Sequence, residues 1–123
     1  MIHEEICTYE VCELAKEKGF DVPTHYAYND NCRKAMYMEL CLNRNTKDSR
    51  SISAPSQSLL QRWLREEKGL HISIPLHKGE YKYFWAIDSL NRKKKEDDIA
   101  YNLFDTYELA LEDALKYALE NLL

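Results

Sequence analysis

Cysteine and histidine are the residues of this chain whose types could support nucleophilic catalysis or metal binding. The four cysteines and four histidines are spread along the sequence: Cys7, Cys12, Cys32, Cys41, His3, His25, His71 and His77. No C-x-x-C or H-E-x-x-H pattern occurs, and the gaps between cysteines match no common zinc spacing. The sequence therefore predicts free or structural thiols, no metal and no cofactor. A Cys–His pair brought together by the fold is the catalytic alternative that stays open.

Other catalytic signatures are missing. The sequence contains no phosphate-binding glycine loop, no dinucleotide-binding fingerprint and no nucleophile elbow. We therefore expect a protein that is not an enzyme.

Two basic groups could contact phosphate: the pair Arg62 and Arg65, and the run Arg92–Lys95. Acids follow each of them, at Glu66 and Glu67 and at residues 96–98. The net charge of the chain is −4, whereas nucleic-acid-binding domains are usually basic. Nucleic-acid binding is therefore an alternative and not the first hypothesis.

Charge and tyrosine content favour a protein partner. Residues 1–30 carry seven acids against two bases, a net charge of −5, and residues 31–68 carry eight bases against four acids, a net charge of +4. The chain has nine tyrosines, a residue that suits interfaces because it combines apolar area with a hydrogen bond. We predict an unidentified protein partner, with self-association included, and name four candidate contact residues: Tyr26, Tyr28, Arg62 and Arg65.

Three helices can be expected from periodicity and capping residues. The first begins at Thr8 as N-cap and ends at Gly19, with Val11, Leu14 and Ala15 facing inward. The second has Ser53 as N-cap and ends at Gly69. Its apolar stripe is Leu59, Leu60, Trp63 and Leu64, so we interpret it as a core helix, with a partner-gripping helix as the alternative.

The third helix follows a D-x-x-E capping box formed by Asp105 and Glu108. Its apolar face contains Tyr107, Ala110, Leu111, Ala114, Leu115, Ala118 and Leu122.

Strands are expected at residues 25–28, 36–42, 70–76, 81–90 and 99–104, mostly from the alternation of apolar and polar residues. Pro75 places the third strand at an edge or a bulge, and the fourth strand should be central because both of its faces are apolar. The order is α-β-β-α-β-β-β-α. We predict a single α+β domain over residues 1–123, with an antiparallel sheet of about five strands and three main helices.

The 123 residues, 45% hydrophobic and 31% charged, are a globular composition. The first residues lack the basic and apolar regions of a signal peptide, and no apolar run is long enough to span a bilayer. We expect a cytoplasmic protein that does not bind membranes.

Four segments of the chain resemble a family of small uncharacterised proteins encoded in phages, prophages and mobile elements of Bacteroides-type gut bacteria. The segments are Lys16–Phe20, Ala54–Gln57, Trp63–Glu66 and Phe104–Glu108, which match the family patterns K-E-K-G-F, A-P-[ST]-Q, W-L-R-E and Y-x-T-Y-E, the last with Phe104 in place of the first tyrosine. The resemblance extends over most of the chain and is weakest over residues 29–50, where a hairpin is therefore an open question. It implies a fold and a phage-related origin, but no activity.

From these observations we expect a non-enzymatic accessory protein of a phage or mobile element that acts through protein–protein interaction. The alternative is a nucleic-acid-binding regulator that uses Arg62, Arg65 and the Arg92–Lys95 loop.

Overall fold

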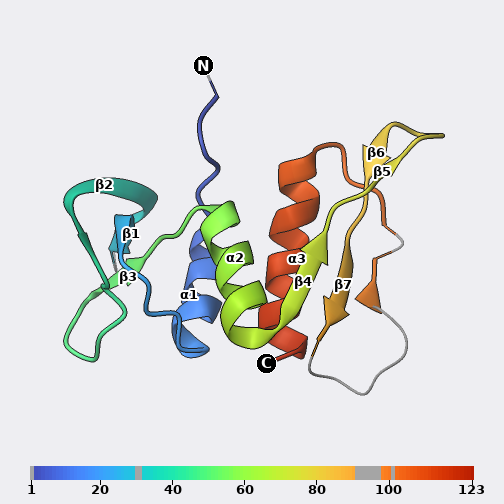
Figure 1. Cartoon of the computed structure of the whole chain (residues 1–123). Helices are drawn as coiled ribbons and strands as arrows, with labels where there is room; N and C mark the ends of the chain where they lie inside the picture. Colours follow the sequence, from blue (N-terminus) through green and yellow to red (C-terminus); the bar gives the residue numbers. More distant parts are fainter. Residues whose placement is uncertain (1, 30–31, 91–97, 101) are drawn as a thin grey trace. The chain divides into compact units, whose positions relative to one another are not determined.

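The structure is a computed structural model that describes residues 2–29, 32–90, 98–100 and 102–123. The α+β class is confirmed: the described residues form three helices and a set of short antiparallel strands, in the order α1-β1-β2-β3-α2-β4-β5-β6-β7-β8-α3 (Figure 1). Within the described residues, eight strands replace the expected five, because two of the predicted strands are each divided in two and β3 was not expected. The Arg92–Lys95 run lies outside the described residues.

The chain divides into two compact units, residues 1–59 and residues 60–123, and the division falls inside α2 (Gln57–Lys68). That residues 1–123 behave as one domain stays a prediction.

The first unit begins with α1 (Tyr9–Glu17), whose two predicted caps are confirmed. The Thr8 hydroxyl accepts a hydrogen bond from the Val11 N–H at 3.4 Å. At the other end Gly19 has φ +91°, and the Phe20 N–H donates to the Ala15 carbonyl at 2.9 Å. This geometry is a Schellman motif, which satisfies the last carbonyls of the helix and directs Phe20 inward, where it is buried.

The buried face of α1 differs from the expected one at a single position. Val11, Cys12 and Ala15 are buried, whereas Leu14 is only half-buried. A cysteine therefore occupies the core position that the apolar pattern assigned to a leucine, in keeping with the tendency of free cysteines to be buried.

The sheet of the first unit has the strand order β2-β1-β3. The predicted strands appear as β1 (Thr24–Asn29) and β2 (Cys32–Leu42), and they pair antiparallel. The open question of a hairpin is thereby answered for the two paired strands, Thr24–Asn29 and Cys32–Leu42. The third strand, β3 (Ser51–Ser53), lies in a segment where no strand was expected.

Ser53 was wrongly predicted as the N-cap of the second helix. It belongs to β3, and the following Ala54 N–H still donates to the Tyr26 carbonyl of β1 at 2.9 Å. Because the backbone stays extended to that point, α2 begins only at Gln57, and the Ser56 hydroxyl accepts the hydrogen bond from the Leu59 N–H at 3.2 Å. Gly69, with φ +67°, follows the helix as predicted.

The second unit contains a three-stranded sheet in the order β4 (Leu70–Ser73), β7 (Ala86–Ser89) and β8 (Asp98–Ile99). It also contains a two-stranded ribbon of β5 (Leu76–His77) and β6 (Lys82–Tyr83). The prediction that strand 81–90 is central is confirmed for its second half, β7. The predicted strand 70–76 is interrupted at Pro75, which has no N–H for a ladder and whose carbonyl instead accepts from the Phe84 N–H at 3.2 Å.

Tyr81, expected on a strand, lies in the turn of the ribbon. Its φ is +53° and its side chain is 79% exposed. The strand 81–90 therefore starts one residue later, at β6, and is interrupted again before β7.

The last helix, α3 (Tyr107–Asn121), is capped by Thr106 and not by Asp105, so that prediction was wrong. The Thr106 hydroxyl accepts from the Leu109 N–H at 3.1 Å, while the Asp105 carboxylate lies 3.3 Å from the ammonium group of Lys82. The buried positions of α3 are Ala110, Leu111, Ala114, Leu115, Ala118 and Leu119. Tyr107 and Leu122 of the predicted face are less buried, and Leu119 replaces them.

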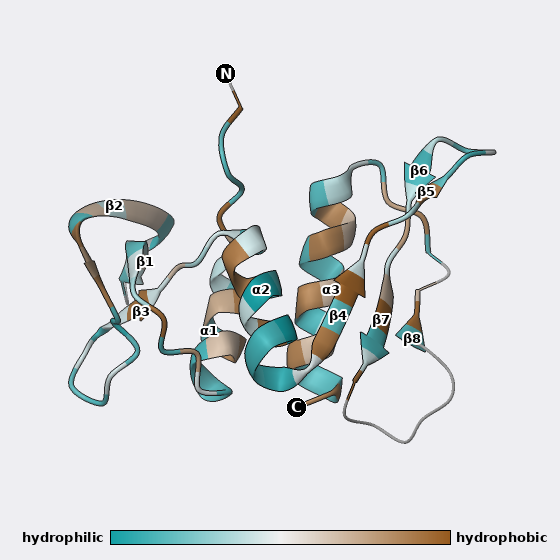
Figure 2. Cartoon of the chain, viewed as in Figure 1, coloured by the Kyte–Doolittle hydropathy of each residue, from teal (hydrophilic) through white to brown (hydrophobic). Residues whose placement is uncertain are grey.

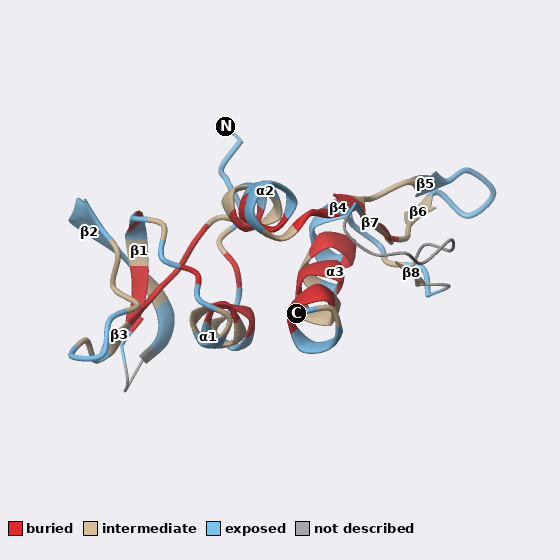
Figure 3. Cartoon of the chain, turned by 60° about the horizontal axis from the view of Figure 1, so that its bottom comes forward, coloured by how far each residue is buried: buried red, intermediate tan, exposed pale blue. Residues whose placement is uncertain are grey.

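α3 lies beside β4 and β7. The segments of α3 that are hydrophobic in Figure 2 are also buried in Figure 3. Trp85, just before β7, connects the sheet to α3. Its indole N–H donates to the Asp113 carboxylate at 2.8 Å, and its ring centre lies 4.8 Å from that of Tyr117. One side chain thus provides both apolar contact and a hydrogen bond between sheet and helix.

Candidate functional site

The helix that carries the two candidate arginines buries its apolar stripe. Trp63 is 6% exposed and Leu60 and Leu64 are fully buried, in agreement with the core-helix interpretation. Arg62 and Arg65 are exposed, and the Arg62 guanidinium is paired with the Glu66 carboxylate at 3.1 Å. This surface of α2 is therefore charged but partly neutralised, and a binding role for the two arginines stays a prediction.

The two candidate tyrosines occupy different environments on β1. Tyr28 is buried, and its hydroxyl donates to the Cys7 carbonyl at 2.7 Å. Tyr26 is half-buried, and its ring packs edge-on against Tyr37 of β2 at 5.5 Å between centres. Tyr28 thus contributes mainly to the interior of the first unit, whereas Tyr26 supports the surface of β2.

That surface is the most unusual one in the first unit. Five large apolar side chains of β2 are exposed, with Leu40 at 68% and Tyr37 at 61%. We use the name β2 face for all five, which come from both sides of the strand because the adjacent Met36 and Tyr37 point in opposite directions: Met36, Tyr37, Met38, Leu40 and Leu42. Parts of β2 are brown in Figure 2, and most of the strand is pale blue in Figure 3. Exposed apolar residues are normal when scattered singly, but a row on one element marks an interaction site.

The pairing of β2 with β1 explains why these side chains are exposed. Thr24 is opposite Leu42 and Asn29 is opposite Cys32, so six residues of β1 are matched by eleven of β2. The additional residues form two bulges, one on each side of the regular pairs Tyr26–Tyr37 and Ala27–Met36. Bulges bend a strand and redirect its side chains, which fits a role in displaying them.

Two side chains hold the larger bulge, at residues 38–41, in place. The His25 Nδ1 donates to the Met38 carbonyl at 3.1 Å, and its ring stacks on Tyr37. The Arg44 guanidinium donates to the Leu40 carbonyl at 2.8 Å and to the Thr24 carbonyl at 2.9 Å. Carbonyls that β1 cannot reach are therefore satisfied by side chains, and the bulge has a defined shape.

Replacing Arg44 with methionine should lower the stability of the chain by about 1–3 kcal/mol, because hydrogen bonds to a charged group are lost while the volume is kept. Urea denaturation measures the effect. Arg50→Met, an exposed position in the same connection, is the matched control and should change stability by less than about 0.5 kcal/mol. Equal effects of the two substitutions would contradict the bridging role of Arg44.

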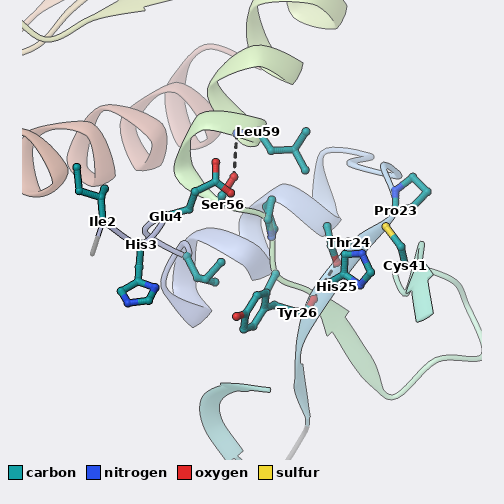
Figure 4. Close-up of a pocket in the computed structure, with 13 residues that line it drawn as sticks. Ile2, His3, Glu4, Pro23, Thr24, His25, Tyr26, Cys41, Ser56 and Leu59 are labelled. Atoms are coloured by element: carbon teal, nitrogen blue, oxygen red, sulfur yellow. Dashed lines mark hydrogen bonds between the residues drawn. The ribbon is translucent and has the colours of Figure 1, made fainter. Parts of the chain in front are cut away.

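An open cavity of about 420 Å³ adjoins the bulge within the first unit. His3 and Glu4 of the N-terminal segment line one part of it, and His25, Tyr26 and Cys41 line another (Figure 4). Cys41 thus shares this cavity with two histidines, His3 and His25. An activated thiol needs a base within hydrogen-bond reach of its sulfur. The His25 ring is instead hydrogen-bonded to the Met38 carbonyl.

A second cavity, of about 410 Å³, lies in the second unit. Its lining includes His77, Phe84, Ile99, Ala100 and Leu103. The lining is mainly apolar, and the His77 Nδ1 accepts from the Glu80 N–H at 3.3 Å. It therefore offers shape and hydrophobicity but few converging polar groups.

Comparison with protein-family models, with curated proteins and with solved structures finds no match for this chain. The site must therefore be interpreted from its own geometry. Across the described residues, no three His, Cys, Asp or Glu side chains come together in a way that could hold a metal ion. The described helices include none with the length and hydrophobicity needed to cross a membrane.

The sequence identified part of this site. Alternation predicted β2, and tyrosine content drew attention to Tyr26. The exposure of the β2 face and the role of Arg44 were missed, because both depend on the mismatch in length between two paired strands. The only local signal was the uninterrupted alternation Met36, Met38, Leu40, Leu42 beside a much shorter neighbouring strand.

Proposed function

We propose that this chain is a non-enzymatic, cytoplasmic accessory protein of a phage or mobile element and acts through protein–protein interaction. The observation that carries the interaction is the β2 face, a row of large apolar side chains exposed on the edge strand of a sheet. The phage-related origin is supported only by the four sequence segments that resemble that family.

The composition of the β2 face suits a protein partner. Tyrosine and methionine are enriched in interfaces, and methionine adapts to irregular surfaces. Because His25 and Arg44 already fix the bulge, binding would require little further ordering of the backbone, and such preorganisation strengthens association. In this proposal Tyr26 supports the face through Tyr37, Tyr28 anchors β1 beneath it, and Arg62 and Arg65 contribute charge outside it.

Leu40→Glu should abolish binding to the partner while leaving the fold intact, because a 68% exposed side chain contributes little to stability. Affinity capture from cells of the source organism, followed by reconstitution with the purified partner, measures the effect. Leu109→Glu, at an exposed leucine of α3, is the matched control and should bind as the parent does. A partner that both variants retain, or the absence of any stoichiometric partner, a second copy of the chain included, would contradict the proposal.

The nucleic-acid alternative makes a different prediction. If Arg62 and Arg65 contacted phosphates, the chain would shift DNA or RNA in a gel at low salt, and added salt would abolish the shift because the contacts release counterions. We expect no shift even at low salt, given the net charge of −4 and the Arg62–Glu66 pair. A salt-sensitive shift that is lost in Arg62→Ala/Arg65→Ala would favour the regulator instead.

A further inference from the structure

The outer edge of β2 is available for strand pairing. β2 stands at the end of the strand order β2-β1-β3. The carbonyls of Met38 and Leu40 accept from His25 and Arg44, side chains that lie on the β1 side. Because successive carbonyls of an extended strand point to opposite edges, that of Tyr37, which belongs to the regular pairs, points outward. Exposed edges pair readily with another strand, and here the pairing would have to follow the bends that the two bulges give β2.

The charges of β2 suit pairing with its own copy. Arg33 and Lys34 lie near its start and Glu39 nearer its end, so two antiparallel copies bring opposite charges together. An antiparallel pair between identical chains has a two-fold axis, and the residue on the axis faces its own copy. In such a pair, residues equally distant from the axis on either side face each other.

One register satisfies the charges directly. Centring the axis on Met36 places Arg33 opposite Glu39 of the second copy, and does so twice. Centring it on Tyr37 instead places Glu39 opposite Ala35. The Met36-centred register also places the small Ala35 opposite the large Tyr37, a pairing of complementary volumes.

Arg33 is already oriented for this role. Its guanidinium carbon lies 4.2 Å from the centre of the Tyr9 ring. A guanidinium that stacks on an aromatic face keeps its edge free to donate hydrogen bonds to a carboxylate. Less side-chain freedom is then lost when the ion pair forms.

We infer that the partner of the β2 face is a second copy of this chain, joined through antiparallel pairing of β2 with β2 about Met36. The inference rests on the proposed function, because it names the partner of the same surface. Two three-stranded sheets would become one continuous sheet, and the apolar side chains of both copies would lie next to one another across the axis.

Sedimentation equilibrium over a range of concentrations should give a species of twice the 14.6 kDa chain mass. Glu39→Arg should weaken the dimer roughly a hundredfold, about tenfold for each of the two symmetric sites, because it places like charges opposite each other. Adding Arg33→Glu to that variant should restore dimerisation. Glu67→Arg, a reversal at an exposed position of α2, is the control and should leave the dimer unchanged.

Cross-linking tests the register independently. Even-numbered residues near the axis direct their carbonyls to β1, so Met36 would face its copy as a non-hydrogen-bonded pair, with Cα atoms about 4.5 Å apart. This separation allows a disulfide. In a Cys32→Ser/Cys41→Ser background, which removes the native cysteine that this register places opposite residue 40, Met36→Cys should form a covalent dimer on mild oxidation, and Leu40→Cys, four residues from the axis, should not.

The outcomes separate this inference from the proposed function. A chain that stays monomeric at every concentration, or a dimer that is insensitive to Glu39→Arg, would overturn the inference. If Leu40→Glu nevertheless abolished binding to a different purified protein, the proposed function would stand with another partner. If the chain dimerised through β2 and bound nothing else, self-association would itself be the interaction.

Discussion

Trp63→Ala is expected to lower the free energy of unfolding by about 3–5 kcal/mol, because it removes a large buried side chain and leaves a cavity behind. Trp63 is 6% exposed and belongs to the same stripe of α2 as the fully buried Leu60 and Leu64. A loss of this size is a large part of a typical domain stability of about 5–15 kcal/mol. Urea denaturation followed by circular dichroism measures it.

The flanking arginines provide the matched comparison. Arg62→Ala and Arg65→Ala should each lower stability by about 0–1 kcal/mol, since exposed ion pairs such as Arg62–Glu66 contribute little. If α2 were instead a helix that binds a partner through Trp63, the Trp63→Ala variant would have the same melting temperature as the parent chain and would no longer bind that partner. That outcome would overturn the core-helix interpretation.

Capping residues show how far local chemistry can predict this fold. Thr8 and Gly19 were predicted correctly because no neighbouring residue competes for their roles. At the other two helices, two candidate caps lie close together, and the wrong one was chosen. Ser53 is held in β3 by its pairing with β1, and Asp105 yields the cap to Thr106 while it pairs with Lys82. For Ser53 the outcome was decided by the pairing of β3 with β1, a long-range contact that is not visible in the sequence.

Strand alternation predicted where the backbone is extended but not where each strand is interrupted. Residues 70–76 and 81–90 each follow an apolar alternation, and each is divided near the β5–β6 ribbon. Pro75 gave a local warning of the first interruption, since it cannot donate to a ladder. Tyr81 gave none, because positive φ at a tyrosine is imposed by the turn around it and not favoured by the residue.

The candidate site was the hardest part to predict, and the reason is geometric. Tyr26 and Tyr28 are equivalent in the sequence, two positions apart on one strand. In the structure one supports the surface of β2, while the other is buried and hydrogen-bonded to Cys7. The β2 face depends on eleven residues pairing with six, a mismatch that becomes visible only when the pairing register is known.

Phe20→Ala is the second substitution with a large expected effect, again about 3–5 kcal/mol. The Phe20 side chain is 1% exposed, and its backbone N–H completes the Schellman motif of α1. For a chain of this length such a loss corresponds to a decrease of roughly 10–20 °C in melting temperature. Ile2→Ala, at a residue of the same unit that is 99% exposed, should leave the melting temperature nearly unchanged.

The same variant tests whether the chain is a single domain. Phe20 lies in the first unit, whereas both tryptophans, Trp63 and Trp85, lie in the second, so tryptophan fluorescence reports on the second unit alone. A chain of 123 residues is within the usual size of one domain, and such domains unfold in a single transition. Phe20→Ala should therefore lower the fluorescence and circular-dichroism transitions together. A fluorescence transition that stays at the parent's temperature, while circular dichroism shows two steps, would mean that the two units unfold independently.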